Sequence, residues 1–126
     1  SEMCIRDRSA FILKALFMAI CFMESSNNPN CVNGKAVGIV QIQPALIADL
    51  NKWGYKYTLE DRLNPSKCEK MFYIYTSHYI TKLKLEDSVQ NRANIWRYGA
   101  YGRKGKTPYA LKAEKLVNKA LNSNKS

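Results

Sequence analysis

The sequence predicts a single all-helical domain, and three observations support this prediction. The chain has 126 residues, which is enough for one hydrophobic core but not for two. An apolar run from Ala15 to Met23 has the length of a short buried helix and interrupts otherwise mixed sequence. Farther along, Asn64-Pro65 and Thr107-Pro108 each pair a capping residue with a proline suited to a first helical turn.

The first half of the chain contains two of the expected helices. The first is predicted from about Ala10 to Ser25 with Ser9 as its N-cap, and its nearly continuous apolar surface indicates a central helix. Residues 26–38 are predicted to form a polar loop, because glycine and proline interrupt them. The alternating stretch 39–43 is expected to run extended, and a helix then follows from Pro44 to Lys52.

Three further helices are expected in the second half. One runs from Pro65 to about Lys82 and carries an apolar and aromatic stripe that we assign to packing. Another is expected from Glu86 to Tyr98. Glycine-rich residues 99–105 separate it from a last helix, which begins at Thr107-Pro108 and ends near Leu121.

The first eight residues are predicted to be a non-native leader, so the domain is assigned to residues 9–126. Residues 3–8 resemble a translated sequencing-adaptor fragment that recurs in metagenomic assemblies. A signal peptide is the alternative, because Arg6 and Arg8 precede an apolar run. Lys14 interrupts that run and no small-x-small cleavage site follows, so a buried helix is favoured. The run is too short to span a bilayer, and no membrane span is expected.

The four cysteines stand at positions 4, 21, 31 and 68, and they form no CxxC pair. His78 is the only histidine, so neither a zinc site nor any other metal or cofactor is predicted. Four cysteines allow three complete disulfide pairings. Outside the cytoplasm Cys31 with Cys68 is the favoured pair, while free buried thiols are an equal alternative.

Glu24 is the candidate catalytic residue. It closes the apolar run and opens a polar one from Ser25 to Asn30, so its carboxyl group is expected at the end of a buried helix beside a loop. Burial and the negative end of the helix dipole both disfavour a charged carboxylate. A proton retained in this way can be donated, which suits a general acid. A solvated glutamate at a fraying helix end is the alternative.

Several motifs follow one another in an order that resembles the soluble lytic transglycosylase and goose-type lysozyme family. The motifs are Glu24-Ser25, Gly38-Ile39-Val40-Gln41-Ile42-Gln43-Pro44, Glu60-Asp61-Arg62 with Asn64-Pro65, Ile95-Trp96-Arg97-Tyr98-Gly99, and Thr107 with Tyr109. The resemblance covers about residues 10–121 and implies an all-α, lysozyme-like helical domain with a glycan-binding cleft. The chain departs from the family at Trp96, Arg97 and Gln43, where Tyr, Asn and an apolar residue are usual.

This resemblance implies an enzyme that cleaves the β-1,4 bond between N-acetylmuramic acid and N-acetylglucosamine in peptidoglycan. Glu24 would act as its single general acid and base. The residues expected to bind the substrate are Ser25, Gln41, Gln43, Trp96, Tyr98 and Tyr109. Peptidoglycan glycan strands are the expected partner of a monomer that works in the periplasm, in the cell wall, outside the cell or on a phage.

Two kinds of alternative stay open. The first is a hydrolytic goose-type lysozyme, a muramidase. Glycosidases usually need two carboxylates, and residues 25–48 contain neither Asp nor Glu, so the transglycosylase is favoured, with Asp61 as the possible second carboxylate. The second alternative rests on the net charge of +10, which attracts polyanions of several kinds. It is a basic module that binds nucleic acid through Arg103, Lys104, Lys106 and the last helix, or a non-catalytic phage structural protein.

Overall fold

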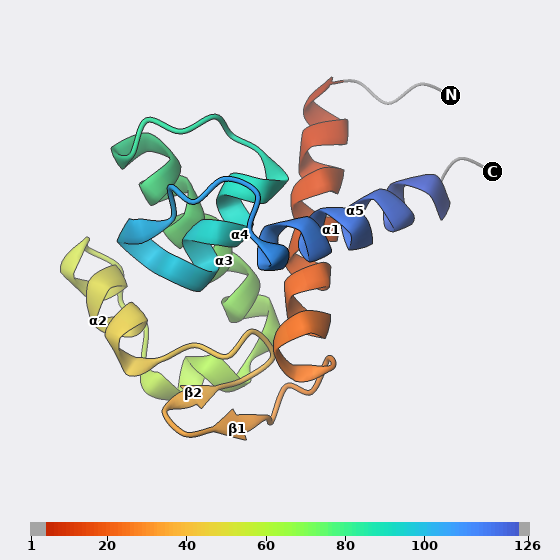
Figure 1. Cartoon of the computed structure of the whole chain (residues 1–126). Helices are drawn as coiled ribbons and strands as arrows, with labels where there is room; N and C mark the ends of the chain where they lie inside the picture. Colours follow the sequence, from red (N-terminus) through yellow and green to blue (C-terminus); the bar gives the residue numbers. More distant parts are fainter. Residues whose placement is uncertain (1–4, 124–126) are drawn as a thin grey trace. The chain divides into compact units, whose positions relative to one another are not determined.

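A computed structural model describes the backbone of residues 5–123 and the side chains of residues 8–123 (Figure 1). Helices dominate it and the sheet is very small, which confirms the predicted all-α class. The elements in chain order are α1 (Ile5–Ser25), β1 (Val32–Asn33), β2 (Ala36–Val37), α2 (Pro44–Lys52), the 3-10 helix η1 (Leu59–Leu63), α3 (Pro65–Lys82), α4 (Val89–Tyr98), the 3-10 helix η2 (Gly99–Tyr101) and α5 (Pro108–Ser123).

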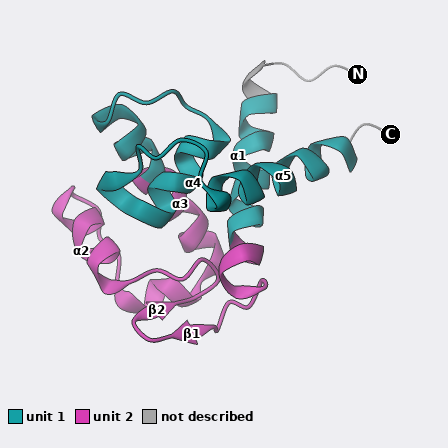
Figure 2. Ribbon diagram, viewed as in Figure 1, with its two compact units in different colours: residues 1–20, 76–126 teal, residues 21–75 magenta. Residues whose placement is uncertain are grey.

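The chain divides into two compact units, which Figure 2 shows in different colours. Unit 2 comprises residues 21–75, and unit 1 comprises residues 1–20 and 76–126. The last turn of α1 and most of α3 therefore belong to unit 2, together with the hairpin and α2. Unit 1 contains the rest of α1, the end of α3, and the helices α4 and α5.

Unit 2 is built around a short antiparallel hairpin and the two helices that follow it. Strands β1 and β2 pair Val32 with Val37 and Asn33 with Ala36. The chain then turns back, and Ile42 pairs with Val37 in an isolated bridge. Apolar side chains from this turn, α2 and α3 are buried, and they are Val40, Ile42, Ile47, Leu50, Met71 and Phe72.

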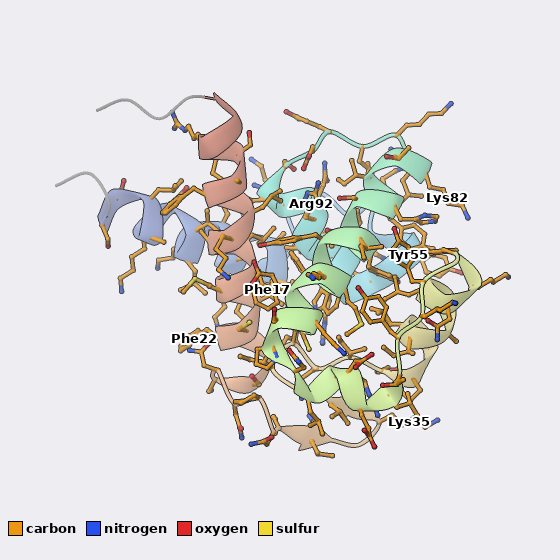
Figure 3. All side chains as sticks on the ribbon, turned by 180° about the vertical axis from the view of Figure 1, so that it is seen from behind. Phe17, Phe22, Lys35, Tyr55, Lys82 and Arg92 are labelled. Atoms are coloured by element: carbon orange, nitrogen blue, oxygen red, sulfur yellow. The ribbon has the colours of Figure 1, made fainter. Side chains whose placement is uncertain are left out.

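Unit 1 is held together by a packed pair of helices and by two polar networks. In α4 the fully buried Asn94 donates a hydrogen bond to the Gly105 carbonyl (2.7 Å) and accepts one from the Thr107 hydroxyl (2.6 Å). The same hydroxyl accepts the Ala110 amide (3.0 Å) and so caps the start of α5. The buried Arg92, labelled in Figure 3, forms the second network, which joins α4 to the end of α3.

The predicted helix boundaries are confirmed where a proline marks the first turn, because α2 and α3 have the predicted bounds. The prediction of Ser9 as an N-cap is wrong, since α1 begins at Ile5 and Ser9 lies inside it. Helix α4 begins at Val89 instead of Glu86, because the Ser88 hydroxyl accepts the Asn91 amide (3.1 Å) and caps the helix there. The last helix extends slightly past the predicted end, to Ser123.

The region between α1 and α2 differs most from its prediction. The expected polar loop contains the β1–β2 hairpin. Residues 39–43 were expected to be extended, but Gly38 to Gln41 form a tight turn in which Gln41 has a φ of 58°. Only Ile42 of this stretch makes a strand-like pairing. The physical reason is that Gly38 and Gln41 both adopt left-handed backbone, which alternation in hydrophobicity does not reveal.

Cys21, Cys31 and Cys68 are free thiols, so the favoured Cys31–Cys68 disulfide is not formed, and Cys4 lies outside the described residues. Burial raises the pKa of the Cys68 thiol to about 11. None of the helices in the described range is long and apolar enough to cross a membrane.

Candidate active site

Glu24 lies in the last turn of α1, and its side chain is half-buried. The helix ends just after it because Ser26 and Asn27 both adopt left-handed backbone, with φ of 53° and 66°. Their amides donate to the last carbonyls of the helix, Ser26 to Phe22 (3.0 Å) and Asn27 to Cys21 (3.2 Å). The carboxyl group of Glu24 therefore sits where an apolar helix changes abruptly into a polar loop.

Ser25 ties this helix end to the turn that precedes α2. Its hydroxyl donates to the Ile39 carbonyl at 2.7 Å and lies 3.1 Å from the Cys21 carbonyl, and it accepts the Asn28 amide at 3.1 Å. The hydroxyl hydrogen and one acceptor lone pair of Ser25 are thus used within unit 2. The turn 38–41 therefore lies beside the last turn of α1. The residue that joins the two is Ser25, which directly follows Glu24.

Gly38 is required in that turn for two independent reasons. Its φ of 95° is a conformation that residues with a side chain rarely adopt. A Cβ atom at this position would also lie 1.9 Å from the Arg62 carbonyl oxygen, so the backbone of η1 leaves no room for one. The glycine of the Gly-x-x-Gln motif therefore permits close packing between the turn and η1.

Gln41 is the last residue of the turn, and its side-chain amide is held by hydrogen bonds to backbone carbonyls. Its Nε2 donates to the carbonyls of Cys31 (3.1 Å) and Gly38 (2.9 Å), which uses both of its hydrogens. These two bonds fix the orientation of the side-chain amide. Oε1 is then the one polar atom of this amide that the two bonds do not use. Within the described part of the chain Oε1 accepts no hydrogen bond, and it is therefore an available acceptor on a half-buried side chain.

Arg62 anchors the same turn from the other side, a role that the sequence analysis did not identify. Its Nη1 donates to the carbonyls of Lys35 and Ile42 (both 3.1 Å), and its Nε donates to Leu59 (2.9 Å). One guanidinium thus joins the hairpin loop, which Lys35 marks in Figure 3, to the strand residue after Gln41 and to η1. The signal that could have revealed this role was the arginine next to Asp61 in the quoted motif.

Asp61, the possible second carboxylate, is engaged on both oxygens. Oδ2 accepts the Thr58 amide at 2.8 Å in a capping box at the start of η1, and Oδ1 accepts the Lys67 ammonium at 2.9 Å. The Thr58 amide, followed by Lys67, lowers the pKa of this carboxyl group. The group is therefore held as a charged helix cap. Gln43 occupies the N-cap position of α2, and its exposed side chain does not cap that helix.

The three aromatic candidates belong to unit 1. Trp96 is half-buried in α4, and Tyr98 is the exposed last residue of that helix. The Lys104 ammonium lies 5.3 Å from the centre of the Tyr98 ring. Tyr109 is half-buried in the first turn of α5, with the Arg97 guanidinium 5.6 Å from its ring centre. Cations thus lie against both tyrosine rings, and Arg97 occupies the position where asparagine is usual in the third motif.

The chemistry that these groups offer is that of proton transfer and hydrogen bonding. Among residues 8–123 no group of three or more His, Cys, Asp or Glu side chains could hold a metal ion. Glu24, whose side chain is half-buried, is followed directly by Ser25, and the Ser25 hydroxyl is bonded to a turn that presents the Gln41 amide oxygen. This combination suits donation of a proton to a bound ligand that also carries N–H or O–H donors.

Comparison with known proteins gives one match. The model of the family described as the transglycosylase SLT domain matches residues 7–95, which is more than half of the chain. The match includes Glu24, the turn 38–41 and Asp61, and it ends before Trp96, Tyr98 and Tyr109. Neither the curated proteins nor the solved structures gave a match.

Proposed function

The chain belongs to the transglycosylase SLT domain family, and we propose that it is a peptidoglycan lytic transglycosylase in which Glu24 is the single general acid and base. Enzymes of this family cleave glycosidic bonds in peptidoglycan outside the cytoplasm. The observation that carries the proposal is the position of Glu24, at the end of α1 beside the hydrogen-bonded turn 38–41. We propose that the bond cleaved beside Glu24 is the β-1,4 bond between N-acetylmuramic acid and N-acetylglucosamine.

In the proposed reaction Glu24 acts twice. Its carboxyl group first donates a proton to the glycosidic oxygen, so the bond from that oxygen to C1 breaks and N-acetylglucosamine leaves as an alcohol. The resulting carboxylate then takes the proton of the muramic C6 hydroxyl while O6 bonds to C1. The carboxyl group is restored and no water is consumed. Intramolecular attack needs no positioned water, because the C6 hydroxyl has a high effective concentration at C1.

Gln41 and Ser25 have different roles in this proposal. Gln41 binds the substrate through Oε1, which can accept the N–H of an N-acetyl group or a sugar hydroxyl while Nε2 stays on the backbone. Ser25 is a positioning residue, because its hydroxyl is used within the protein and sets the turn beside Glu24. Gln43, Trp96, Tyr98 and Tyr109 remain expected substrate contacts on the strength of the motif order.

The single-carboxylate route is supported by the hydrogen bonds and the ion pair that occupy the carboxylate of Asp61. An inverting hydrolase needs a second carboxylate to activate water, and a retaining one needs a second carboxylate as nucleophile. Asp61 is occupied as the cap of η1 and as the partner of Lys67. A carboxylate held in this way is poorly placed to take a proton from water, so the goose-type lysozyme is the less favoured reading.

Replacement of Glu24 by Gln tests the proposal. Gln keeps the shape of the side chain but has no proton of suitable acidity, so the rate of wall lysis should fall about 100- to 10,000-fold. Circular dichroism and the melting temperature should stay as in the unmodified chain. Glu60→Gln is the matched control, because Glu60 is exposed in η1, and it should lyse walls normally. A folded Glu24→Gln protein with near-normal lysis would refute the assignment.

A further inference from the structure

The positive charge of this protein is concentrated in unit 1. Residues 76–123 contain 10 Lys+Arg against 3 Asp+Glu, whereas residues 21–75 of unit 2 contain 6 against 5. The unit that carries Glu24 is therefore nearly neutral. Because the excess charge lies outside that unit, it suggests a second interaction surface in addition to the proposed catalytic site.

The acids of this region do little to neutralise it. Asp87 accepts two hydrogen bonds from the buried Arg92 (2.7 and 3.0 Å), so this pair is already balanced. Glu114 accepts the Gln90 amide at 3.1 Å and is half-buried. Glu114 keeps its negative charge when it accepts this neutral amide, so α5 carries one carboxylate against the three exposed lysines Lys112, Lys115 and Lys119.

Helix α5 separates its apolar and basic residues onto different sides. Ala110, Ala113 and Val117 are buried on one side. Lys112, Lys115 and Lys119 follow one another at spacings of three and four residues, which places their exposed side chains along one flank. None of the three forms an ion pair with a residue in the described range. Figure 1 shows α5 as the dark blue helix that ends near the C-terminus.

A shallow groove accompanies this row of lysines. It runs along the solvent side of α5 and is lined by Leu111, Glu114, Lys115, Asn118, Lys119, Asn122 and Ser123. Ammonium groups bind phosphate, while the amide and hydroxyl groups of asparagine and serine bind hydroxyl groups. Apart from the carboxylate of Glu114, the lining therefore combines partners for phosphates with partners for an alcohol-rich backbone.

We propose that this face of α5, defined by Lys112, Lys115, Lys119, Asn118 and Asn122, binds a polyol-phosphate polymer of the cell wall. The flexible phosphodiester chain lies along the helix with its phosphates on the lysines and its hydroxyls on the asparagines. Binding of this kind holds the enzyme on the wall while unit 2 acts on the glycan. The choice of a wall polymer rests on the proposed function, since it assumes that the chain works on peptidoglycan.

The same observations disfavour two other polyanions. Proteins that bind single-stranded nucleic acid interleave aromatic rings with their basic residues so that bases can stack, and no aromatic residue lines the groove on α5. Helices that lie on anionic membranes present large apolar side chains next to their lysines. The groove on α5 has only Leu111 of that kind. A polyol-phosphate chain needs neither feature.

The test is a pair of charge-matched triple variants. Lys112→Gln, Lys115→Gln and Lys119→Gln together remove the lysine row and keep the helix propensity. The control combines Lys52→Gln, Lys56→Gln and Lys70→Gln, which removes the same charge from exposed positions in unit 2. Binding to soluble poly(glycerol phosphate) is measured from low to high salt. Duplex DNA, an oligothymidine and anionic phospholipid vesicles are measured alongside, as is cleavage of a short uncharged glycan.

We expect the α5 variant to bind poly(glycerol phosphate) about tenfold or more weakly at low salt. The slope of log affinity against log salt should become shallower by about 2 units, since each lost phosphate contact removes about 0.7. The control should bind as the unmodified chain does, and both variants should cleave the short glycan normally. If the unmodified chain does not cleave the short glycan, the proposed function is refuted, and the proposal about α5 is judged by binding alone.

Three results would overturn the proposal about α5. They are unchanged binding of poly(glycerol phosphate) by the α5 variant, an equal loss in the control, and tighter binding of DNA or vesicles than of poly(glycerol phosphate) at equal phosphate concentration. Circular dichroism of both variants confirms that the comparison is made between folded proteins.

Discussion

The side chains of Ser25 and Gln41 hold the loop beside Glu24 by hydrogen bonds to backbone groups. Ser25 reaches the Ile39 carbonyl, and Gln41 reaches the carbonyls of Cys31 and Gly38. Motif order drew attention to both residues but could not divide their roles, since a hydroxyl or an amide in a motif can serve either the protein or its substrate. Their hydrogen-bond partners show that Nε2 of Gln41 is used within the protein, and we therefore propose its Oε1 as the group that meets a ligand.

Gly38 is the residue whose replacement should damage the turn most. Gly38→Ala puts a methyl group against the Arg62 carbonyl in addition to the cost of left-handed backbone, so it should destabilise the fold by about 3 kcal/mol or more. Gly34→Ala is the control, because its φ of 62° is also left-handed but the space around it is open. It should cost only about 1–2 kcal/mol. Urea unfolding measures both, and equal losses would show that close packing against Arg62 is unimportant.

Asp61→Asn should have little effect on catalysis. Asn keeps the size of the side chain but loses the charge that Lys67 and the η1 cap attract. The lytic rate should therefore change by less than about tenfold, compared with the loss of 100-fold or more expected for Glu24→Gln. Parallel assays of the two variants on purified walls make the comparison. A loss in Asp61→Asn as large as in Glu24→Gln would identify Asp61 as a catalytic carboxylate.

The helices were predictable from sequence where a local signal fixes their start. Pro44 and Pro65 set the beginnings of α2 and α3, because proline suits the first turn of a helix, and both helices have the predicted bounds. The start of α4 was placed three residues early, since the Ser88 cap was not identified. Ser9 was a misleading signal, because serine also occurs inside helices, and here α1 continues through it.

The hairpin and the turn after it could not be predicted from hydrophobic pattern. Strands β1 and β2 have two residues each, which is too short for a period-two pattern to appear. Their geometry depends on contacts with distant residues, above all on Arg62, which joins Lys35 to Ile42. The site residues named from the motif order therefore stay predictions, while the backbone turn around Gly38 and Gln41 required the structure.

The junction between α3 and α4 yields a prediction about pH. The hydrogen bonds from Arg92 lower the pKa of Asp87, so the charged pair stabilises the fold above the usual Asp pKa near 4. That contribution is lost as the pH falls through the lowered value. Asp87→Asn should thus cost about 1 kcal/mol at pH 7, a modest amount because the Asp87 side chain is 59% exposed.

Urea unfolding of Asp87→Asn and the unmodified chain at pH 7 and at successively lower pH, down through the lowered pKa of Asp87, measures this effect. The difference between the two proteins should vanish in acid. Glu86→Gln, which changes the exposed neighbouring acid, is the control and should show little difference at either pH. A difference that persists undiminished in acid would mean that Asp87 acts through its shape and not through its charge.

At the scale of the whole molecule, the net charge can be counted from the sequence. The distribution of that charge between the two units cannot, because it requires the structure. The sum of +10 follows from counting, but the contrast between the two units depends on which residues pack together. This division is what allows the proposed glycan cleavage in unit 2 and the proposed polymer binding on α5 to be tested separately. Lysines of α5 can be changed without touching the hydrogen bonds around Glu24.

The most direct test of the central claim is mass spectrometry of the products released from purified peptidoglycan. Hydrolysis adds one water to each cleaved bond, whereas attack by the muramic C6 hydroxyl adds none. The single-carboxylate account predicts products that end in 1,6-anhydro-N-acetylmuramic acid and that disappear in Glu24→Gln. A digest dominated by hydrated, reducing muramic ends would contradict it and would make this protein a lysozyme.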